Sequence, residues 1–161
     1  MTPGTPSIAA MPAFYTHWQL IMFRDGRRRD PQMTPFVQHL TDEDLGDLAA
    51  YYEAQKATRR PAAVDASKAA AGRSLAERHH CTSCHSPTLM GQQQVPRLAG
   101  QDFDYLLRRL RGYRAKTTSD LDGMMTMVSQ SLSEEDIQNL VHFIAGLAPS
   151  AAGAAATGGT P

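Results

Sequence analysis

The stretch Cys81-Thr82-Ser83-Cys84-His85 holds both cysteines of this 161-residue chain, with a histidine directly after the second one. This CxxCH pattern is typical of covalent attachment of c-type haem. On a helical turn, residues i and i+3 lie roughly 5–6 Å apart at Cβ, so two such thiols can add to the two vinyl groups on one edge of a porphyrin. The imidazole of His85 can then reach the iron from the proximal side. The pattern predicts Cys81 and Cys84 as haem attachment residues and His85 as an axial ligand.

Two parts of the chain repeat one another. Residues 6–15 align without a gap with residues 96–105, and both segments begin with proline and end with tyrosine. Further along, Asp42-Glu43-Asp44 aligns with Glu134-Glu135-Asp136 at the start of a predicted helix. Chance similarity between amphipathic helices does not explain this shared order well. The first copy has no counterpart of the CxxCH segment.

A sixth iron ligand is expected among the methionines of Gly123-Met124-Met125-Thr126-Met127. A thioether is a soft, neutral donor that favours ferrous iron and raises the reduction potential. The repeat singles out Met125, since it aligns with Met33. Met124 and Met127 remain alternatives, and any methionine here could instead fill the core. If protein groups hold both axial positions, the haem carries electrons and binds no substrate.

The hydrophobic spacing predicts a mostly α-helical chain. Acidic residues behind Thr41 and Ser133 are typical of capped helix starts, and a single Ala-rich helix is expected over 69–84. The predicted organisation is a partial cytochrome c-like repeat without CxxCH at 1–56, a linker at 57–66, a complete domain at 67–148 and a disordered tail at 149–161.

Composition excludes several classes of function. The 16 basic and 16 acidic residues give zero formal net charge, which argues against a general nucleic-acid or anionic-membrane binder. No stretch approaches the roughly 18–20 apolar residues that span a bilayer, and residues 1–10 show no features of a signal peptide. Two cysteines make no disulfide framework.

Other interpretations of the cysteines are weaker. A thioredoxin-like CxxC would need a βαβ context, and a zinc site would need a second pair of ligands. His79 and His80 precede Cys81, but on one continuous helix they could not converge with both cysteines on a metal. His17, His39 and His142 show no partner pattern and are expected at the surface or at the haem rim.

Residues 67–148 resemble a complete domain of the two-haem class I c-type cytochromes of bacterial periplasms, the cytochrome c4 group. Residues 5–55 resemble the later part of a preceding domain. The matching motifs are Cys81-Thr82-Ser83-Cys84-His85, Val95-Pro96-Arg97-Leu98-Ala99-Gly100-Gln101, Tyr105, Gly123-Met124-Met125 and Leu132-Ser133-Glu134-Glu135-Asp136. The resemblance implies a class I cytochrome c fold, with helices packed around a covalently attached haem.

The resemblance also implies roles for individual residues. Cys81 and Cys84 would hold one haem c by thioethers, and His85 and Met125 would ligate its iron. The carbonyl near Pro96 would accept the proximal imidazole N–H, which fixes the tautomer and basicity of that ring. Such a protein is a periplasmic one-electron carrier and not an enzyme. Its partners would be a terminal oxidase or a dehydrogenase, with peripheral association with a membrane complex as an option.

The first repeat departs from the family pattern, because it has Met33 but no cysteines or ligand histidine. The simplest interpretation is a chain that starts late within a longer protein, and the alternative is a degenerate first repeat. In either case, we expect the first repeat to be loosely packed or to borrow contacts from the second. Two other functions stay open: a haem subunit of a larger oxidoreductase, and a peroxidase or gas binder with an open iron site.

Overall fold

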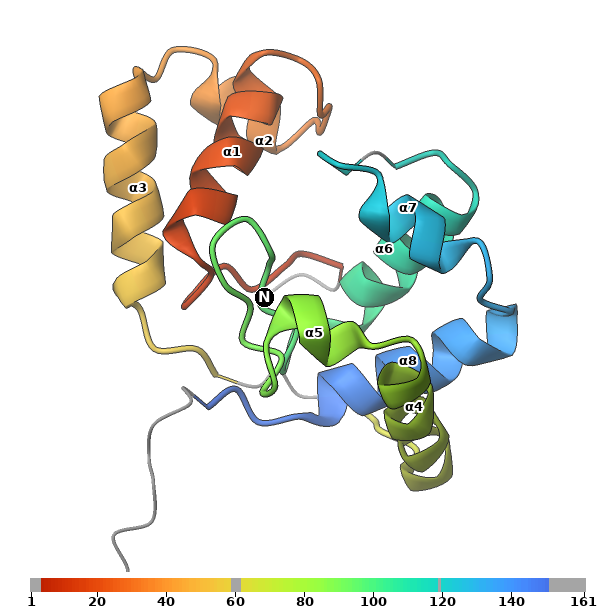
Figure 1. Cartoon of the computed structure of the whole chain (residues 1–161). Coiled ribbons are helices and arrows are strands. Elements are labelled where there is room, and N and C mark those ends of the chain that lie inside the picture. Colours follow the sequence, from red (N-terminus) through yellow and green to blue (C-terminus); the bar gives the residue numbers. More distant parts are fainter. Residues whose placement is uncertain (1–3, 59–61, 119, 151–161) are drawn as a thin grey trace, which may run out of the picture.

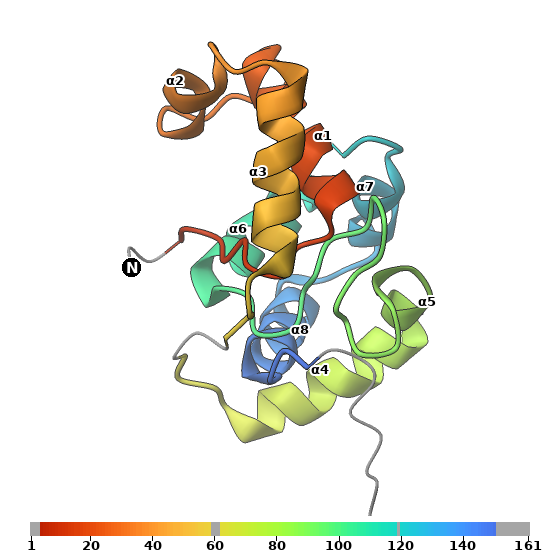
Figure 2. The same ribbon diagram turned by 90° about the vertical axis from the view of Figure 1, so that its left-hand side faces the viewer.

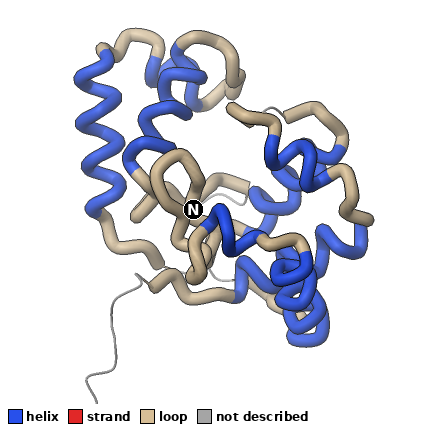
Figure 3. Tube along the Cα trace, in the orientation of Figure 1, coloured by secondary structure: helices blue, strands red, loops and turns tan. Residues whose placement is uncertain are grey.

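The computed structural model describes residues 4–58, 62–118 and 120–150. These residues form helices and loops, and their only β-type pairing is an isolated bridge between Gln92 and Val95 (Figures 1 and 3). The prediction of a mostly helical chain is confirmed. In chain order the helices are α1 (Ala13–Arg24), α2 (Met33–Val37), α3 (Asp42–Ala54), α4 (Ala66–Arg78), α5 (Cys81–His85), α6 (Phe103–Arg114), α7 (Met124–Ser129) and α8 (Glu134–Gly146).

The larger core forms where α4 crosses α8 and α6 packs on α8 (Figure 2). α8 begins with a capping box, in which Ser133 and Asp136 satisfy each other's backbone N–H groups. One face of α8 then buries its apolar side chains against α4 and α6, with buried core members Leu75, Ala76, Leu106, Leu110, Ile137, Leu140, Val141 and Ile144. Burial of this apolar surface is the main force that holds the second repeat together.

The first repeat has a smaller core between α1, α2 and α3. Its buried members are Leu20, Phe23, Val37 and Leu45. α3 begins with a capping box of Thr41 and Asp44, which matches the capping box at the start of α8. Large apolar side chains stay exposed around this core, among them Phe14, Phe36 and Tyr51. The internal repeat is therefore visible in the helices, although one half is far less well covered.

The segment before α1 is bonded to the second repeat. The backbone N–H of Gly4 donates to Asp102 Oδ1 at 3.0 Å, and the backbone N–H of Ser7 donates to Gln101 Oε1 at 2.6 Å. Gln101 Nε2 donates in return to the carbonyl of Ser7 at 2.9 Å. The first repeat thus has the borrowed contacts that its incomplete core led us to expect.

The domain limits proposed from the sequence remain a prediction. Residues 59–61 of the proposed linker and residues 151–161 of the proposed tail lie outside the described residues. None of the described helices is long and apolar enough to cross a membrane.

The prediction of one helix over 69–84 is wrong. α4 ends at Arg78, and His80 takes a left-handed conformation with φ of 52° before α5 starts at Cys81. A left-handed residue at the end of a helix turns the chain out of the helical path. The cysteines therefore lie on a turn of their own, and not on an extension of α4.

Helix α4 approaches α8 most closely at Gly72. A Cβ atom added there would lie 2.0 Å from the backbone oxygen of Asn139, whereas a Cβ on Gly46, in the interior of α3, would meet nothing within 4 Å. We expect Gly72→Ala to destabilise the protein by about 1–3 kcal/mol through overpacking. Gly46→Ala should stabilise it by about 0.5–1 kcal/mol through helix propensity. Thermal unfolding of both variants measures this, and equal melting temperatures would contradict the proposed close approach.

Of the two positions expected for His142, the surface is wrong, because the structure buries this side chain. Its Nδ1 accepts the backbone N–H of Asp65 at 3.1 Å, and its ring packs edge-on against Phe103 at 4.9 Å. Burial, and then the charge of Lys68, lower the pKa of His142, against a smaller opposing effect of Asp65. The neutral ring is therefore the form that the fold binds.

The lowered pKa of His142 predicts how the free energy of unfolding depends on pH. The contribution of His142 is complete above its unfolded pKa of about 6.5 and is lost as the pH falls towards the lower folded pKa. We expect His142→Gln, which can still accept the Asp65 N–H, to lose less stability than the wild type between about pH 7 and pH 5. Urea unfolding at several pH values compares the two proteins. Parallel curves would contradict this account.

Candidate haem-binding site

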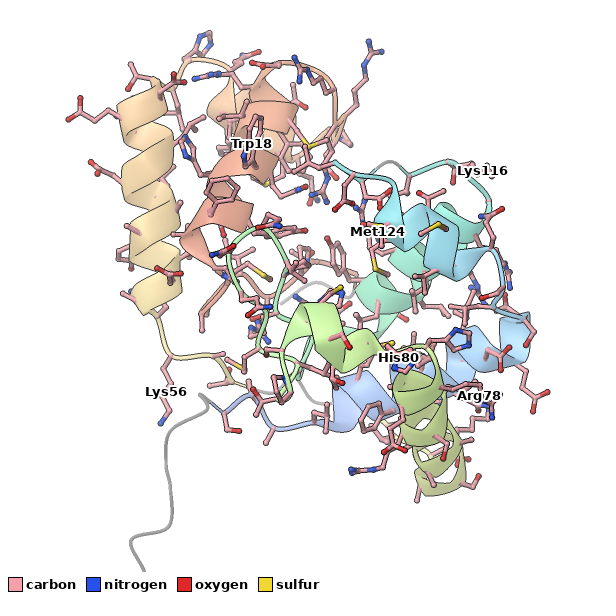
Figure 4. The ribbon with its side chains drawn as sticks, viewed as in Figure 1. Trp18, Lys56, Arg78, His80, Lys116 and Met124 are labelled. Carbon is pink, nitrogen blue, oxygen red and sulfur yellow. The ribbon has the colours of Figure 1, made fainter. Side chains whose placement is uncertain are left out.

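The two cysteines lie on α5, a single short turn of helix. Both thiols are free; Cys81 is half-buried and Cys84 is exposed. Burial raises the pKa of the Cys81 thiol, and the nearby Cys84 adds to this effect. The turn is bounded by two residues with positive φ, His80 at 52° and Ser86 at 70° (Figure 4 labels His80). Such strained backbone in non-glycine residues persists only where the surrounding structure enforces it, so the position of α5 is tightly specified.

His85, the last residue of α5, is buried and has one ring nitrogen bound to the protein. Its Nδ1 lies 2.9 Å from the carbonyl oxygen of Pro96. A carbonyl only accepts, so Nδ1 carries the proton and donates it. Burial lowers the pKa of His85, while the bond to Pro96 acts in the opposite direction. In the neutral ring the lone pair is then on Nε2, which is the arrangement that a metal-ligating histidine needs.

The loop from 86 to 101 fixes the Pro96 carbonyl. The backbone N–H of Gly91 donates to the carbonyl of His85 at 2.9 Å. Gly91 has φ of +74°, and a Cβ there would lie 2.5 Å from the carbonyl carbon of Pro96. The backbone N–H groups of Leu98 and Ala99 both donate to the carbonyl of Leu89. This tight loop keeps the acceptor of the His85 ring in place.

Met125 is the most enclosed of the three candidate methionines. It packs against the larger core, as do Cys81 and Leu98. Met124, labelled on α7 in Figure 4, is 45% exposed and Met127 is 61% exposed. The structure therefore places one methionine, and the same one that the repeat singled out, on the side of α7 that faces the core.

Asp120 holds the start of α7. Its Oδ2 accepts the backbone N–H groups of Met125 at 2.6 Å and Thr126 at 3.3 Å, and its Oδ1 accepts the Thr126 hydroxyl at 2.7 Å. Asp120 was not predicted as a site residue, although an acidic side chain just before a helix is a recognised capping signal. Arg97 was named only as part of the motif at 95–101, and no local signal pointed to Met11.

Met33 lies in the first repeat, half-buried against the smaller core of Leu20, Phe23, Val37 and Leu45. Cys81 packs against the larger core instead, so Met33 and Cys81 belong to different hydrophobic clusters. Within the described residues, no three His, Cys, Asp or Glu side chains gather in a way that could hold a metal ion.

Comparison with known proteins adds to this geometry. Residues 69–148 match the Cytochrome c family. The chain is 34% identical to cytochrome c4 of Thiocapsa roseopersicina, over 91% of this chain and 81% of that protein. The crystal structure of reduced recombinant cytochrome c4 from Pseudomonas stutzeri superposes with a TM-score of 0.82 at 28% identity, covering 91% and 86% of the two chains.

The chain belongs to the cytochrome c4 family. It is a c-type cytochrome, an electron carrier, and the prediction of a class I cytochrome fold is confirmed. It is also 34% identical to a protein named thiosulfate dehydrogenase electron acceptor from Stutzerimonas stutzeri, over 88% of this chain and 70% of that protein. A thiosulfate dehydrogenase from Marichromatium purpuratum contains a similar fold, with a TM-score of 0.76 at 32% identity over 89% of this chain and 33% of that one.

The donor set of the second repeat fits a covalently bound haem. Two free thiols lie one helical turn apart on α5, and the imidazole next to them presents Nε2 with its lone pair. The fit of His85 to the iron rests on the hydrogen bond between its Nδ1 and the Pro96 carbonyl. The first repeat lacks cysteines altogether.

The role of Asp120 can be tested by substitution. Asp120→Ala removes three hydrogen bonds at the start of α7 and should cost about 1–2 kcal/mol of unfolding free energy. Asp122→Ala is the matched control, since Asp122 is exposed and accepts the backbone N–H of Met124 at 3.1 Å as its one bond within the described residues. Chemical unfolding separates the two variants. Equal losses would show that Asp120 has no special part in placing α7.

Proposed function

We propose that the second repeat holds one haem c and carries one electron at a time. Cys81 and Cys84 would attach the haem, and His85 and Met125 would ligate its iron. The observation that carries this proposal is the hydrogen bond from His85 Nδ1 to the Pro96 carbonyl, because it leaves Nε2 as the ligating nitrogen. When bound, haem supplies an Fe(III)/Fe(II) couple that gains or loses one electron.

The protein groups of this site bind and orient, and they perform no substrate chemistry. The hydrogen bond to Pro96 fixes the rotation of the His85 ring. The hydrogen bond from the backbone N–H of Met125 to Asp120 fixes the position of Met125 at the start of α7. With an imidazole and a thioether as ligands, protein side chains would occupy the coordination positions that a substrate would need. We therefore propose an electron carrier and not an enzyme. A peroxidase or gas binder would need one of these positions open.

We propose a count of one haem for residues 1–161. The only two cysteines lie in the second repeat, and Met33 packs in a core that offers no attachment residues. The proposed domain organisation follows: a partial repeat at 1–56, a linker at 57–66, the haem-binding domain at 67–148 and a tail at 149–161.

The names of two relatives support a dehydrogenase as one redox partner, since both are called thiosulfate dehydrogenase electron acceptor. We propose that this chain takes electrons from such a dehydrogenase and passes them towards a terminal oxidase of a bacterial respiratory chain. We also propose a periplasmic location, where covalent attachment of haem takes place. Electron-transfer interfaces are small and short-lived, so we expect weak, transient complexes.

The axial methionine can be identified by substitution in the exported protein. Met125→Leu should abolish the thioether-to-iron absorption band of the oxidised form and lower the reduction potential, because the soft ligand is lost. Met124→Leu and Met127→Leu are matched controls and should keep both. Loss of the band in a control but not in Met125→Leu would reassign the ligand.

The haem count and its attachment are tested by mass. The intact wild-type protein should weigh one haem more than its amino-acid sequence, and a pyridine haemochrome spectrum should give one haem per chain. Replacement of both Cys81 and Cys84 by serine should remove the covalent increment. A colourless wild-type protein with only its polypeptide mass would refute the proposed function.

A further inference from the structure

One amide group connects the first repeat with the candidate axial histidine. The carbonyl oxygen of Pro96 accepts from His85 Nδ1 at 2.9 Å. The N–H of the same amide belongs to Arg97, and it donates to Met11 Sδ at 3.2 Å. Met11 lies in the first repeat and is only 4% exposed. A continuous line of hydrogen bonds therefore runs from a buried thioether, through one peptide group, to the imidazole of His85.

The side chain of Arg97 holds the segment that carries Met11. It is 1% exposed. Its Nε donates to the carbonyl of Ala9 at 3.1 Å, and its Nη2 donates to the carbonyl and the hydroxyl of Ser7, both at 3.0 Å. Its Nη1 donates to the carbonyl of Ala99 in the second repeat. A guanidinium presents its donors in a rigid fork, so residues 7–11 are fixed relative to the Pro96 loop.

The amide itself has little freedom to move. Gly91 lies against it so closely that a Cβ there would be 2.5 Å from the carbonyl carbon of Pro96 and 2.6 Å from the nitrogen of Arg97. Both polar ends of the amide are satisfied, one by each repeat. Because Gly91 restricts movement of the peptide plane, loss of the Met11 acceptor should change the polarisation of the amide and not its position.

Hydrogen bonds in series polarise one another. An acceptor on the Arg97 N–H makes the Pro96 carbonyl a stronger acceptor, and a stronger acceptor on Nδ1–H makes the imidazole a more basic ligand. A more basic imidazole stabilises ferric over ferrous iron. We propose that Met11 and Arg97 are positioning residues through which the first repeat lowers the reduction potential of the centre built on His85. This rests on the proposed function, in which His85 is an axial ligand.

The proposal gives the first repeat a role that needs no haem of its own. Residues 7–11 would hold the peptide that bonds to His85 in the neighbouring repeat. The chemical class of the group that does this is a neutral thioether acceptor, which is weak on its own. The thioether of Met11 can matter here because it is buried and because its donor, the Arg97 N–H, belongs to the amide whose carbonyl accepts from His85.

The test is the reduction potential of the exported holoprotein and of four variants, measured by spectroelectrochemistry. Met11→Leu conserves volume and removes the acceptor. We expect a two- to threefold shift of the reduction equilibrium towards the ferrous form, a rise of roughly 18–28 mV for a one-electron couple. Met11→Gln restores an acceptor oxygen and should return the potential towards that of the wild type. Met22→Leu is the matched control, since Met22 is a buried methionine of α1.

A second measurement excludes a merely structural effect. In the reduced protein, the NMR signal of the His85 Nδ1 proton should move in Met11→Leu and recover in Met11→Gln, and Met22→Leu should leave it in place. Arg97→Lys keeps the buried positive charge but loses the fork, so its potential should also rise. If Met11→Leu does not fold, the comparison of Arg97→Lys with the wild type decides in the same way.

The outcomes separate the two proposals. Equal potentials and unmoved Nδ1 signals in Met11→Leu, Arg97→Lys and the wild type, with one haem attached in each, would overturn this inference alone. Absence of covalent haem from the wild type would overturn the proposed function as well. A raised potential that Met11→Gln does not reverse would assign the effect to packing and would also overturn the inference.

Discussion

The hydrogen bond between His85 and the Pro96 carbonyl is the constraint on which the site depends. It fixes which nitrogen of a buried imidazole carries the proton, and so which one can bind a metal. The loop from 86 to 101 holds the Pro96 carbonyl in place. Gly91 lies close against the Pro96–Arg97 peptide, and the carbonyl of Leu89 accepts two successive backbone N–H groups. In the proposed function Cys81 and Cys84 attach the haem, whereas the orientation of the His85 ring comes from the hydrogen bond to Pro96.

The two repeats meet through equivalent segments. In the internal alignment Ser7 corresponds to Arg97, and Met11 corresponds to Gln101. Arg97 contacts Met11 and Ser7, and Gln101 contacts Ser7. Such reciprocal pairing of matched positions is the signature of an interface with two-fold symmetry, here between two halves of one chain. The interface has nevertheless become specialised, since a buried arginine from one half faces a serine from the other.

Local signals predicted much of this structure. The capped starts at Thr41 and Ser133 and the CxxCH motif are short patterns whose physical cause lies within a few residues, and the structure has helices at these positions. The break between α4 and α5 was missed, because nothing in the sequence marks a histidine that will adopt a left-handed conformation. The bond from Arg97 to Met11 joins residues 86 positions apart, and no periodicity reports such a pairing.

The contrast between α3 and α8 shows why the first repeat depends on the second. On α8, Asn139 and the Cβ of Phe143 lie against Gly72 of α4. The aligned residues on α3 are Asp47 and Tyr51, and both are exposed. Among the described helices, α3 packs mainly against α1, and its buried Leu45 joins the cluster of Leu20, Phe23 and Val37. The hydrogen bonds of residues 4–11 to the second repeat then stabilise the first repeat. One further bond of this segment, from the Arg97 N–H to Met11 Sδ, involves the peptide whose carbonyl accepts from His85 Nδ1. The contacts that stabilise the first repeat therefore adjoin the candidate axial histidine of the second.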